Sequence, residues 1–218
     1  VNEHMQTNDP DIYAVGDAVE VREFITGDAV QIPLAGPANR QGRIAADHIF
    51  GRPSSFRGMQ GTAVVGVFGM TAAMTGLSEK ALQRTGRSYE KIYLHPTHHA
   101  SYYPGAERMS LKLLFDPGSG KLLGAQAVGT RGVDKRIDVL TIAIQAGMTV
   151  FDLEEAELAY APQFGSAKDP INMAGFIAAG VVRGDAKVVH STDLVGAAIL
   201  DVRTREEFDR GHIPGAVN

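Results

Sequence analysis

The stretch Thr7-Asn-Asp-Pro-Asp-Ile-Tyr-Ala-Val-Gly-Asp-Ala18 decides the fold that we expect for this chain. Its apolar residues 12–15 predict a buried strand that ends in a Gly-Asp pair. Gly16 allows a tight turn and a close approach to a ligand, and Asp17 places an acceptor-only carboxylate at the carboxyl end of the strand. Ligands of open α/β sheets bind at that edge, although a Gly-Asp pair by itself is also a common turn.

A helix is expected to begin at Gly36-Pro37 and to run to about residue 49, because proline suits the first helical turn. Four apolar residues near its end, Ile44, Ala45, Ile49 and Phe50, predict one buried face. The N-terminus of a helix carries about half a positive charge and favours anions. The alternative interpretation is an ordinary helix start without a ligand.

The composition narrows the class of protein. The 218 residues are 44% hydrophobic and 21% charged, with a net charge of -4 and no basic block, so nothing indicates a nucleic-acid or membrane partner. No apolar run reaches the roughly 18 residues of a membrane helix. The absence of cysteine excludes thiol chemistry within the chain and is consistent with the cytoplasm. A start without Met or a signal peptide suggests the interior of a longer protein.

The order of predicted elements divides the chain into three regions. Residues 1–58 contain the first strand and helix, and residues 59–183 read as an α+β unit with strands at 62–68, 89–94, 109–115 and 122–128. We expect Ser78 and Asp152 to cap short helices, and longer helices at about 134–145 and 171–182. Residues 184–218 contain a predicted strand at 198–202 and a helix that begins with a capping box at Thr204.

Two later segments are candidates for chemistry. His95, His98 and His99 offer three imidazoles, but adjacent histidines in a strand point to opposite faces, which disfavours a metal site; a loop with solvated histidines is the alternative. Tyr102 lies in the 98–106 string, which is dense in polar aromatic residues, and Tyr160 directly precedes Ala-Pro. A phenol can donate a hydrogen bond to a thiolate and supply a proton, but a lone tyrosine before Ala-Pro is also typical of packing.

Three strings together resemble one known family. The 7–18 string resembles the second FAD-binding motif of the pyridine nucleotide-disulfide oxidoreductases. Tyr-Tyr-Pro-Gly-Ala at 102–106 and Tyr-Ala-Pro with Ser-Ala-Lys-Asp-Pro at 160–170 are similar to the coenzyme A-disulfide and persulfide reductases of that family. The string at 200–218 resembles the opening of a rhodanese domain.

The resemblance implies a role for particular residues. Tyr102 and Tyr160 match active-site tyrosines that serve the other subunit, and Arg40 and Lys168 match substrate-contacting positions. The alternative for both cations is a solvated surface charge. The FAD-contacting positions implied by the resemblance are Gly16, Asp17, Ala18, Leu34, Ala35 and Ala38. No metal ligand is implied.

The implied fold class is mixed α/β and α+β. It consists of the C-terminal segment of an FAD-binding domain (1–58), a dimerisation domain with a mainly antiparallel sheet (59–183) and the start of a rhodanese (184–218). The intact protein would be a homodimeric reductase that uses FAD and NADH or NADPH. Its small-molecule substrate would be coenzyme A disulfide, coenzyme A persulfide or polysulfide, and its redox cysteine would precede Val1. A non-catalytic interaction module and a relative of NADH oxidases or peroxidases are the alternatives.

Overall fold

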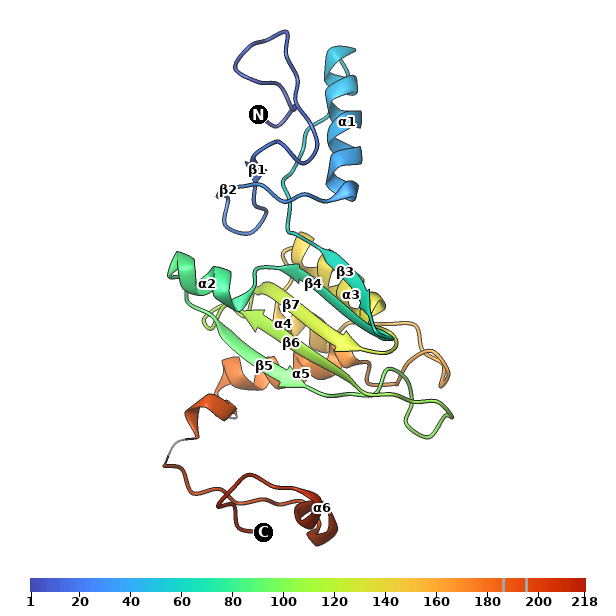
Figure 1. Ribbon diagram of the computed structural model, residues 1–218, viewed down its shortest axis with the longest axis vertical. Helices are drawn as coiled ribbons and strands as arrows, with labels where there is room; N and C mark the ends of the chain where they lie inside the picture. Colours follow the sequence, from blue (N-terminus) through green and yellow to red (C-terminus); the bar gives the residue numbers. More distant parts are fainter. Residues whose placement is uncertain (186, 195) are drawn as a thin grey trace. The chain divides into compact units, whose positions relative to one another are not determined.

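The computed structural model describes residues 1–185, 187–194 and 196–218 (Figure 1). The chain divides into two compact units, Val1–Asp185 and Ala186–Asn218. Each unit is described by itself below. Within the described residues, no helix is long and apolar enough to cross a membrane.

The first part of the larger unit contains little regular structure before its helix. Strands β1 (Val21–Arg22) and β2 (Ala29–Val30) form an antiparallel pair. The buried strand predicted at 12–15 is wrong: Tyr13 makes only an isolated bridge to Gln6, and Ile12 and Val15 are 53% and 42% exposed. A strand is stabilised by partner strands, and the described residues supply none at this position.

Helix α1 (Ala35–Ile49) confirms the predicted helix, but only part of its predicted buried face. Ile44 and Ala45 are buried in a small apolar cluster that also contains Met5 and Met59. Ile49 and Phe50 are exposed, because they lie at the last turn of the helix and outside this cluster.

A five-stranded antiparallel sheet forms the centre of the larger unit, as expected. Its strand order is β3-β4-β7-β6-β5. The strands are β3 (Ala63–Val67), β4 (Met70–Gly76), β5 (Glu90–Leu94), β6 (Met109–Phe115) and β7 (Leu122–Gly129). The turn at 116–121 joins β6 to β7, and Asp116 stabilises it by accepting hydrogen bonds from the backbone of Gly118 and Ser119.

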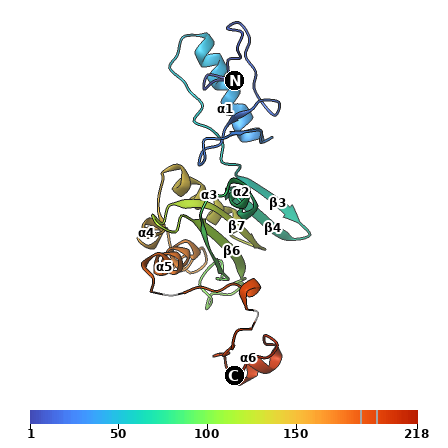
Figure 2. The same cartoon turned by 90° about the vertical axis from the view of Figure 1, so that its left-hand side faces the viewer.

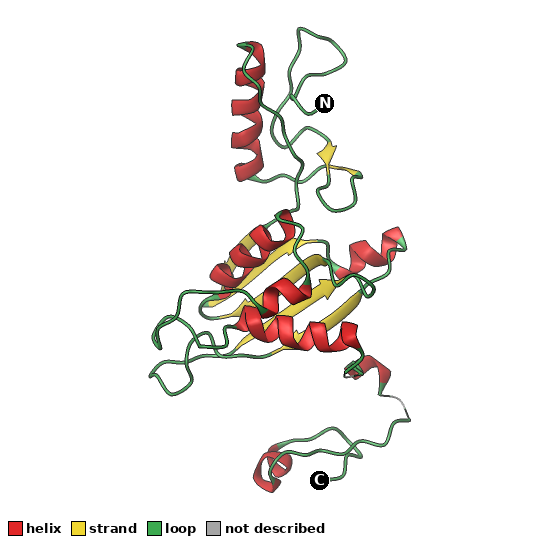
Figure 3. Ribbon diagram, turned by 180° about the vertical axis from the view of Figure 1, so that it is seen from behind, coloured by secondary structure: helices red, strands yellow, loops and turns green. Residues whose placement is uncertain are grey.

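Three helices pack on one face of this sheet (Figures 2 and 3). They are α3 (Val133–Gln145), α4 (Val150–Glu154) and α5 (Pro170–Arg183). Their buried residues, including Ile137, Leu140 and Ile171, join those of the sheet in the largest apolar cluster. Short helix α2 (Glu79–Thr85) packs through Leu82 on Leu114 and Leu123. Leu113, the residue before Leu114, belongs to the main cluster.

Capping explains where the short helices begin. The Ser78 side chain accepts a hydrogen bond from the Ala81 N–H, so the predicted cap of α2 is confirmed. The predicted cap of α4 is wrong: Thr149 is the N-cap residue, and Asp152 lies three residues later. The Asp152 carboxylate accepts from the Thr149 backbone N–H at 2.7 Å, which is the reciprocal half of a capping box.

The smaller unit has little regular structure. It contains a single 3₁₀ turn (Ser191–Asp193) and α6 (Arg205–Arg210) in its described residues. Thr204 caps α6 and exchanges hydrogen bonds with Glu207, as the sequence predicts. The strand predicted at 198–202 is reduced to one bridge between Leu200 and Val217, because no longer ladder forms among the described residues.

Candidate functional site

Two loops of the larger unit bring Tyr102 and Tyr160 together. Tyr102 lies between β5 and β6, and Tyr160 lies between α4 and α5. Their hydroxyl oxygens are 2.9 Å apart and share a hydrogen bond, although the residues are 58 positions apart in the sequence. The side chains are 74% and 47% exposed, so both phenols are accessible from outside the unit.

The hydrogen bond between the phenols affects their chemistry. The hydrogen bond that Tyr160 makes with Tyr102 raises the pKa of Tyr160 above its ordinary value, with smaller contributions from desolvation and from the charge of Tyr102. The raised pKa favours the protonated form of Tyr160, and a protonated phenol can donate a hydrogen bond or a proton to an anionic atom.

A buried ion pair lies beneath the two loops. Arg136 of α3 is 1% exposed, and its Nη2 atom donates to Asp169 Oδ2 at 2.7 Å. The same nitrogen donates to the backbone carbonyl of His98 at 2.8 Å. Asp169 in turn caps α5 by accepting from the Ile171 N–H. One guanidinium therefore contacts both segments that carry the tyrosines.

Of the three histidines near Tyr102, His95 is exposed, as the solvated-loop alternative predicts, but His98 and His99 are not. His98 and His99 are buried, with their ring centroids 4.1 Å apart. Burial lowers the pKa of His98, and the nearby Arg131 and Arg136 act in the same direction, while a backbone hydrogen bond to Glu107 opposes them. The net effect favours the neutral form of His98. No group of three metal-ligating side chains occurs among the residues that the structure describes.

A second polar region is a cleft of about 260 Å³ at the N-terminus of α1. Its lining includes the backbone of Ala35 and Gly36, together with Gln60, Thr62 and Thr141. No side chain caps this helix end: the N-cap residue is Leu34, and Pro37 lacks an N–H. The unpaired N–H groups of the first turn therefore favour an acceptor or an anion here.

Gln60 adds an unusual feature to this cleft. The residue is 7% exposed, and its Nε2 atom donates to Thr75 Oγ1 at 2.7 Å and to the carbonyl of Thr141 at 3.2 Å. Its Oε1 atom is buried without a protein hydrogen-bond partner in the described part of the chain. A buried, unpaired carbonyl is costly, so a donor from a bound ligand would stabilise it.

The segment around Gly16 lies next to the same helix. The Gly16 N–H donates to Gln41 Oε1 of α1 at 2.8 Å, and Gln31 donates to the backbone carbonyl of Asp17 at 2.7 Å. Gly16 has φ +88°, and no protein atom of the described residues lies within 4 Å of the place that a Cβ would occupy. The side chain of Asp17 is exposed. A polar ligand can therefore approach Asp17 and Ala18 freely.

These residues fit the flavin that the family resemblance implies. The uncapped α1 end, which includes Leu34, Ala35 and Ala38, leaves the N–H groups of Ala35 and Gly36 as donors for a negatively charged ring edge, whereas the Ala38 N–H already donates to the Leu34 carbonyl. The exposed carboxylate of Asp17 supplies an acceptor for a hydroxyl group. The roles of the individual residues stay predictions.

The two predicted substrate cations occupy different places. Arg40 is an exposed residue of α1 that lines the cleft near Gln145. Lys168 is exposed in the Tyr160 loop and immediately precedes the α5 cap, Asp169. Lys168 therefore lies in the loop that carries Tyr160, whereas Arg40 lies in α1 and lines the cleft at the N-terminus of that helix.

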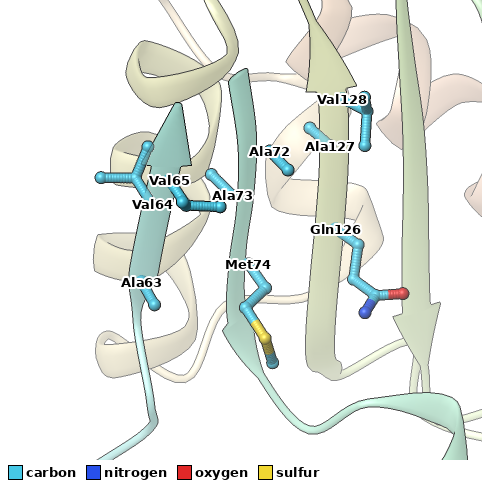
Figure 4. A pocket seen from close by; sticks show the side chains of 9 residues that line it. All are labelled: Ala63, Val64, Val65, Ala72, Ala73, Met74, Gln126, Ala127 and Val128. Atoms are coloured by element: carbon cyan, nitrogen blue, oxygen red, sulfur yellow. The ribbon is translucent and has the colours of Figure 1, made fainter. Parts of the chain in front are cut away.

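An apolar surface covers the free edge of the sheet. A groove of about 380 Å³ crosses β3, β4 and β7 (Figure 4). Val64, Val65 and Val128 are exposed there, and Phe68 is fully exposed at the turn between β3 and β4. Strand β3 pairs only with β4, so its outer edge is open. Apolar edges of this kind are typical of interaction surfaces.

Comparisons with known proteins identify the class. Residues 62–169 match the pyridine nucleotide-disulphide oxidoreductase dimerisation domain, and residues 186–218 match the rhodanese-like domain. The chain belongs to the pyridine nucleotide-disulphide oxidoreductases and carries part of a rhodanese-like domain after the dimerisation domain.

Particular relatives extend this result. Over 81% of the chain, the sequence is 39% identical to a coenzyme A disulfide reductase of Staphylococcus haemolyticus, of which it covers 40%. The structure of reduced Bacillus anthracis CoADR-RHD matches the whole chain with a TM-score of 0.96 and 48% identity, and the chain covers 40% of it.

A NAD-dependent persulfide reductase from A. fulgidus also matches the whole chain, with a TM-score of 0.93, 38% identity and 40% of its own length covered. The chain therefore spans about 40% of the length of these relatives.

Sequence reasoning missed Arg136, Asp169 and Gln60. Arg136 carried a usable signal, because it falls between Val133 and Ile137 on the buried face of a predicted helix. A charged residue at such a position needs a buried partner. The sequence gives no means of choosing that partner among the acidic residues.

Proposed function

We propose that this chain is part of an FAD-dependent, NAD(P)H-using reductase of coenzyme A disulfide, coenzyme A persulfide or polysulfide, fused to a rhodanese. The observation that carries this proposal is the hydrogen-bonded pair of exposed phenols, Tyr102 and Tyr160. The relatives named above, a coenzyme A disulfide reductase and a persulfide reductase, support the substrate class.

The tyrosines serve a sulfur site on the opposite subunit of a homodimer. A phenol that donates a hydrogen bond to a thiolate favours the charged form of the sulfur, and it can supply a proton to a leaving sulfur atom. The reacting thiol is not one of these 218 residues, because the chain contains no cysteine.

The open sheet edge supports the homodimer. The apolar surface formed by Val64, Val65, Phe68 and Val128 is large enough to need a cover, and the matched family model is a dimerisation domain. A second copy of the chain is the partner that we propose. A cytoplasmic location remains a prediction from the cysteine-free composition.

Bound FAD would supply two-electron redox chemistry at the α1 cleft. In this proposal, Leu34, Ala35 and Ala38 present the helix end, and Gly16, Asp17 and Ala18 contact the rest of the cofactor. Arg40 and Lys168 bind the phosphate groups of coenzyme A, because cations and phosphates form strong charge-assisted hydrogen bonds. NADH or NADPH would bind outside these residues.

The test uses the intact reductase that contains this sequence, with coenzyme A disulfide as the substrate. Tyr102→Phe and Tyr160→Phe remove only the hydroxyl groups, and each is expected to lower kcat about 100-fold, a typical effect of losing a proton donor. The double variant is expected to lose little more, because the two hydroxyls act as a unit.

Tyr103→Phe is the matched control, since Tyr103 lies in the same loop and its ring packs edge-on against His99 without a hydroxyl bond to Tyr160. FAD content, read from the visible absorption, should stay constant in all variants. Unchanged kcat in both Tyr102→Phe and Tyr160→Phe would contradict the role of the tyrosine pair, and absence of turnover in the unsubstituted protein would favour the interaction module.

A further inference from the structure

The two tyrosine loops need a device that fixes their separation. Both phenols are exposed, and their shared hydrogen bond spans two loops that belong to different parts of the sequence. An exposed hydrogen bond between two neutral groups contributes little net stability, too little to order two loops against their conformational entropy. The alignment of the phenols must therefore be set beneath them.

Arg136 is the group that contacts both loops from below. Its Nη2 atom donates to the His98 carbonyl at 2.8 Å, four residues before Tyr102. Its Nη2 and Nε atoms donate to Asp169 Oδ2 and Oδ1 at 2.7 and 3.2 Å, nine residues after Tyr160. Its Nη1 atom donates to the Gly132 carbonyl at 3.3 Å, which fixes the guanidinium on α3 itself.

The surroundings leave the guanidinium little freedom. A Cβ at position 132 would lie 2.6 Å from Arg136 Nη1 and 3.2 Å from His98 Cβ, so the loop approaches α3 closely at this glycine. Directly beneath the phenols, the Ala100 N–H donates to the Gly165 carbonyl at 2.8 Å and joins the two loops. Arg136 and this backbone bond together form a continuous link from α3 to both tyrosines.

We propose that Arg136 is a positioning residue that sets the separation of the Tyr102 and Tyr160 hydroxyls by holding the His98 carbonyl and Asp169 at the same time. Its catalytic consequence rests on the proposed function of the tyrosine pair. Lysine cannot replace it, because an ammonium lacks the planar fork that contacts a carboxylate through two nitrogens while reaching a carbonyl.

A purely structural ion pair would behave differently from a positioning residue. It would change stability without changing the relation between the two phenols. The two cases are separated by a readout on Tyr160 itself, since the hydrogen bond that Tyr160 makes with Tyr102 raises the pKa of Tyr160. Loss of alignment returns that pKa toward the ordinary tyrosine value of about 10.

The experiment titrates the 218-residue chain labelled with ¹³Cζ-tyrosine and follows the Tyr160 resonance by NMR. Tyr160→Phe assigns the resonance, and Tyr102→Phe defines the Tyr160 pKa without its partner. The test variants are Arg136→Lys and Asp169→Asn. Asparagine caps helices about as well as aspartate, so Asp169→Asn keeps the start of α5 while weakening the link.

Arg183→Lys is the matched control. Arg183 also forms a two-nitrogen pair with a carboxylate, that of Glu154 at 3.0 and 2.6 Å, but it contacts neither tyrosine loop. All variants are compared well below their melting temperatures, with circular dichroism as the check on folding.

The expected result is that Arg136→Lys and Asp169→Asn lower the Tyr160 pKa to the value in Tyr102→Phe, whereas Arg183→Lys leaves it unchanged. An unchanged Tyr160 pKa in both test variants would overturn the proposal. An equal shift in Arg183→Lys would overturn it too, because general loosening would then explain the change. If Tyr102→Phe itself has no effect, the phenols are not paired and Arg136 has nothing to align.

Turnover of the intact reductase then tests the consequence separately. Arg136→Lys is expected to lower kcat about 10- to 100-fold, as expected for a reacting group misplaced by about 1 Å. If the titration succeeds while Tyr102→Phe, Tyr160→Phe and Arg136→Lys all leave kcat unchanged, the positioning role stands and the proposed function fails.

Discussion

The tyrosine pair and the α1 cleft differ in how their buried polar groups are satisfied. Beneath the tyrosines, Arg136 donates to the Asp169 carboxylate and to two backbone carbonyls, so its charge is completed by protein groups. In the α1 cleft, the helix end has no side-chain cap, and Gln60 Oε1 has no protein partner among the described residues. The first region is complete without a ligand, whereas the second has groups that a ligand can satisfy.

The two regions therefore show two uses of buried polar groups: paired groups fix the geometry of loops, and unpaired groups favour the binding of a ligand. Buried charged groups that are paired with protein atoms hold loops in one geometry, because moving the loops would leave a buried charge without its partner. Groups that protein atoms leave unpaired raise the free energy of the unliganded cleft and favour binding. The predictions below test whether the two regions differ in this way.

The largest effect is expected from Arg136→Met. It leaves the Asp169 carboxylate buried without its cation, so the free energy of unfolding should fall by about 3–5 kcal/mol. Chemical denaturation of the 218-residue chain measures this change. The double variant Arg136→Met, Asp169→Asn is the control, and it should recover part of the loss. A fall of less than about 1 kcal/mol in the free energy of unfolding of Arg136→Met would contradict the view that this ion pair is buried and completed by protein groups.

Glu79 lies at the centre of a third, partly buried polar cluster, in which Tyr89, Lys91 and Lys112 donate to its carboxylate. Burial raises the pKa of Glu79, but hydrogen bonds from Lys112, Lys91 and Tyr89 outweigh it and lower the pKa to about 2. A carboxyl group with a depressed pKa stabilises the folded state at pH values above about 4.5, and this stability is lost as the pH falls toward 2.

The expected contribution of Glu79 is about 2–3 kcal/mol at neutral pH. Urea denaturation of the native chain and of Glu79→Gln at pH 7 and pH 3 measures it. The difference between the two chains should be smaller at pH 3 than at pH 7. A difference that does not depend on pH would show that the lysine contacts add little.

A smaller effect is expected at the cleft. Gln60→Leu removes the unpaired Oε1 atom but also the donor to Thr75 and Thr141, so the free energy of unfolding should change by less than about 1 kcal/mol. Gln41→Leu is the matched control, because buried Gln41 accepts from the Gly16 N–H. Its loss should cost about 1–3 kcal/mol. Equal losses of stability in Gln60→Leu and Gln41→Leu would show that the unpaired oxygen of Gln60 and the paired oxygen of Gln41 do not differ in their effect on folding.

The smallest effect is expected from Leu34→Ser, which adds a capping hydroxyl at the start of α1. A serine cap typically adds about 1 kcal/mol, and the loss of the apolar contact of Leu34 with the small cluster offsets part of it. We expect a net gain of a few tenths of a kcal/mol by thermal unfolding. A clear loss of stability would indicate that the first-turn N–H groups already have partners.

The sequence predicted the dimerisation sheet and its helices closely. Strand 109–115 was predicted with the bounds that β6 has, and Ser78 was predicted as the cap of α2. These features depend on residues that are neighbours in the sequence. The strands predicted at 12–15 and 198–202 failed, because apolar character shows what a segment can bury and not whether partner strands are present.

The candidate site was predicted in part. The tyrosines were named from local strings, but nothing in either string indicated that their hydroxyls lie 2.9 Å apart. Arg136 was missed because its partners, the His98 carbonyl and Asp169, are 38 and 33 residues away. Such contacts depend on the packing of α3 against both loops.

The sequence by itself therefore determined the caps of α2 and α6, the strand pattern of the central sheet and the family of this protein, since these follow from side-chain chemistry within a few positions along the chain. Only the tertiary structure decided which polar groups meet. It paired the two phenols, enclosed Arg136 with Asp169 and left Gln60 Oε1 without a protein partner in the described residues. The physical reason is that hydrogen bonds act over about 3 Å in space, whereas these groups are separated by dozens of residues in the sequence.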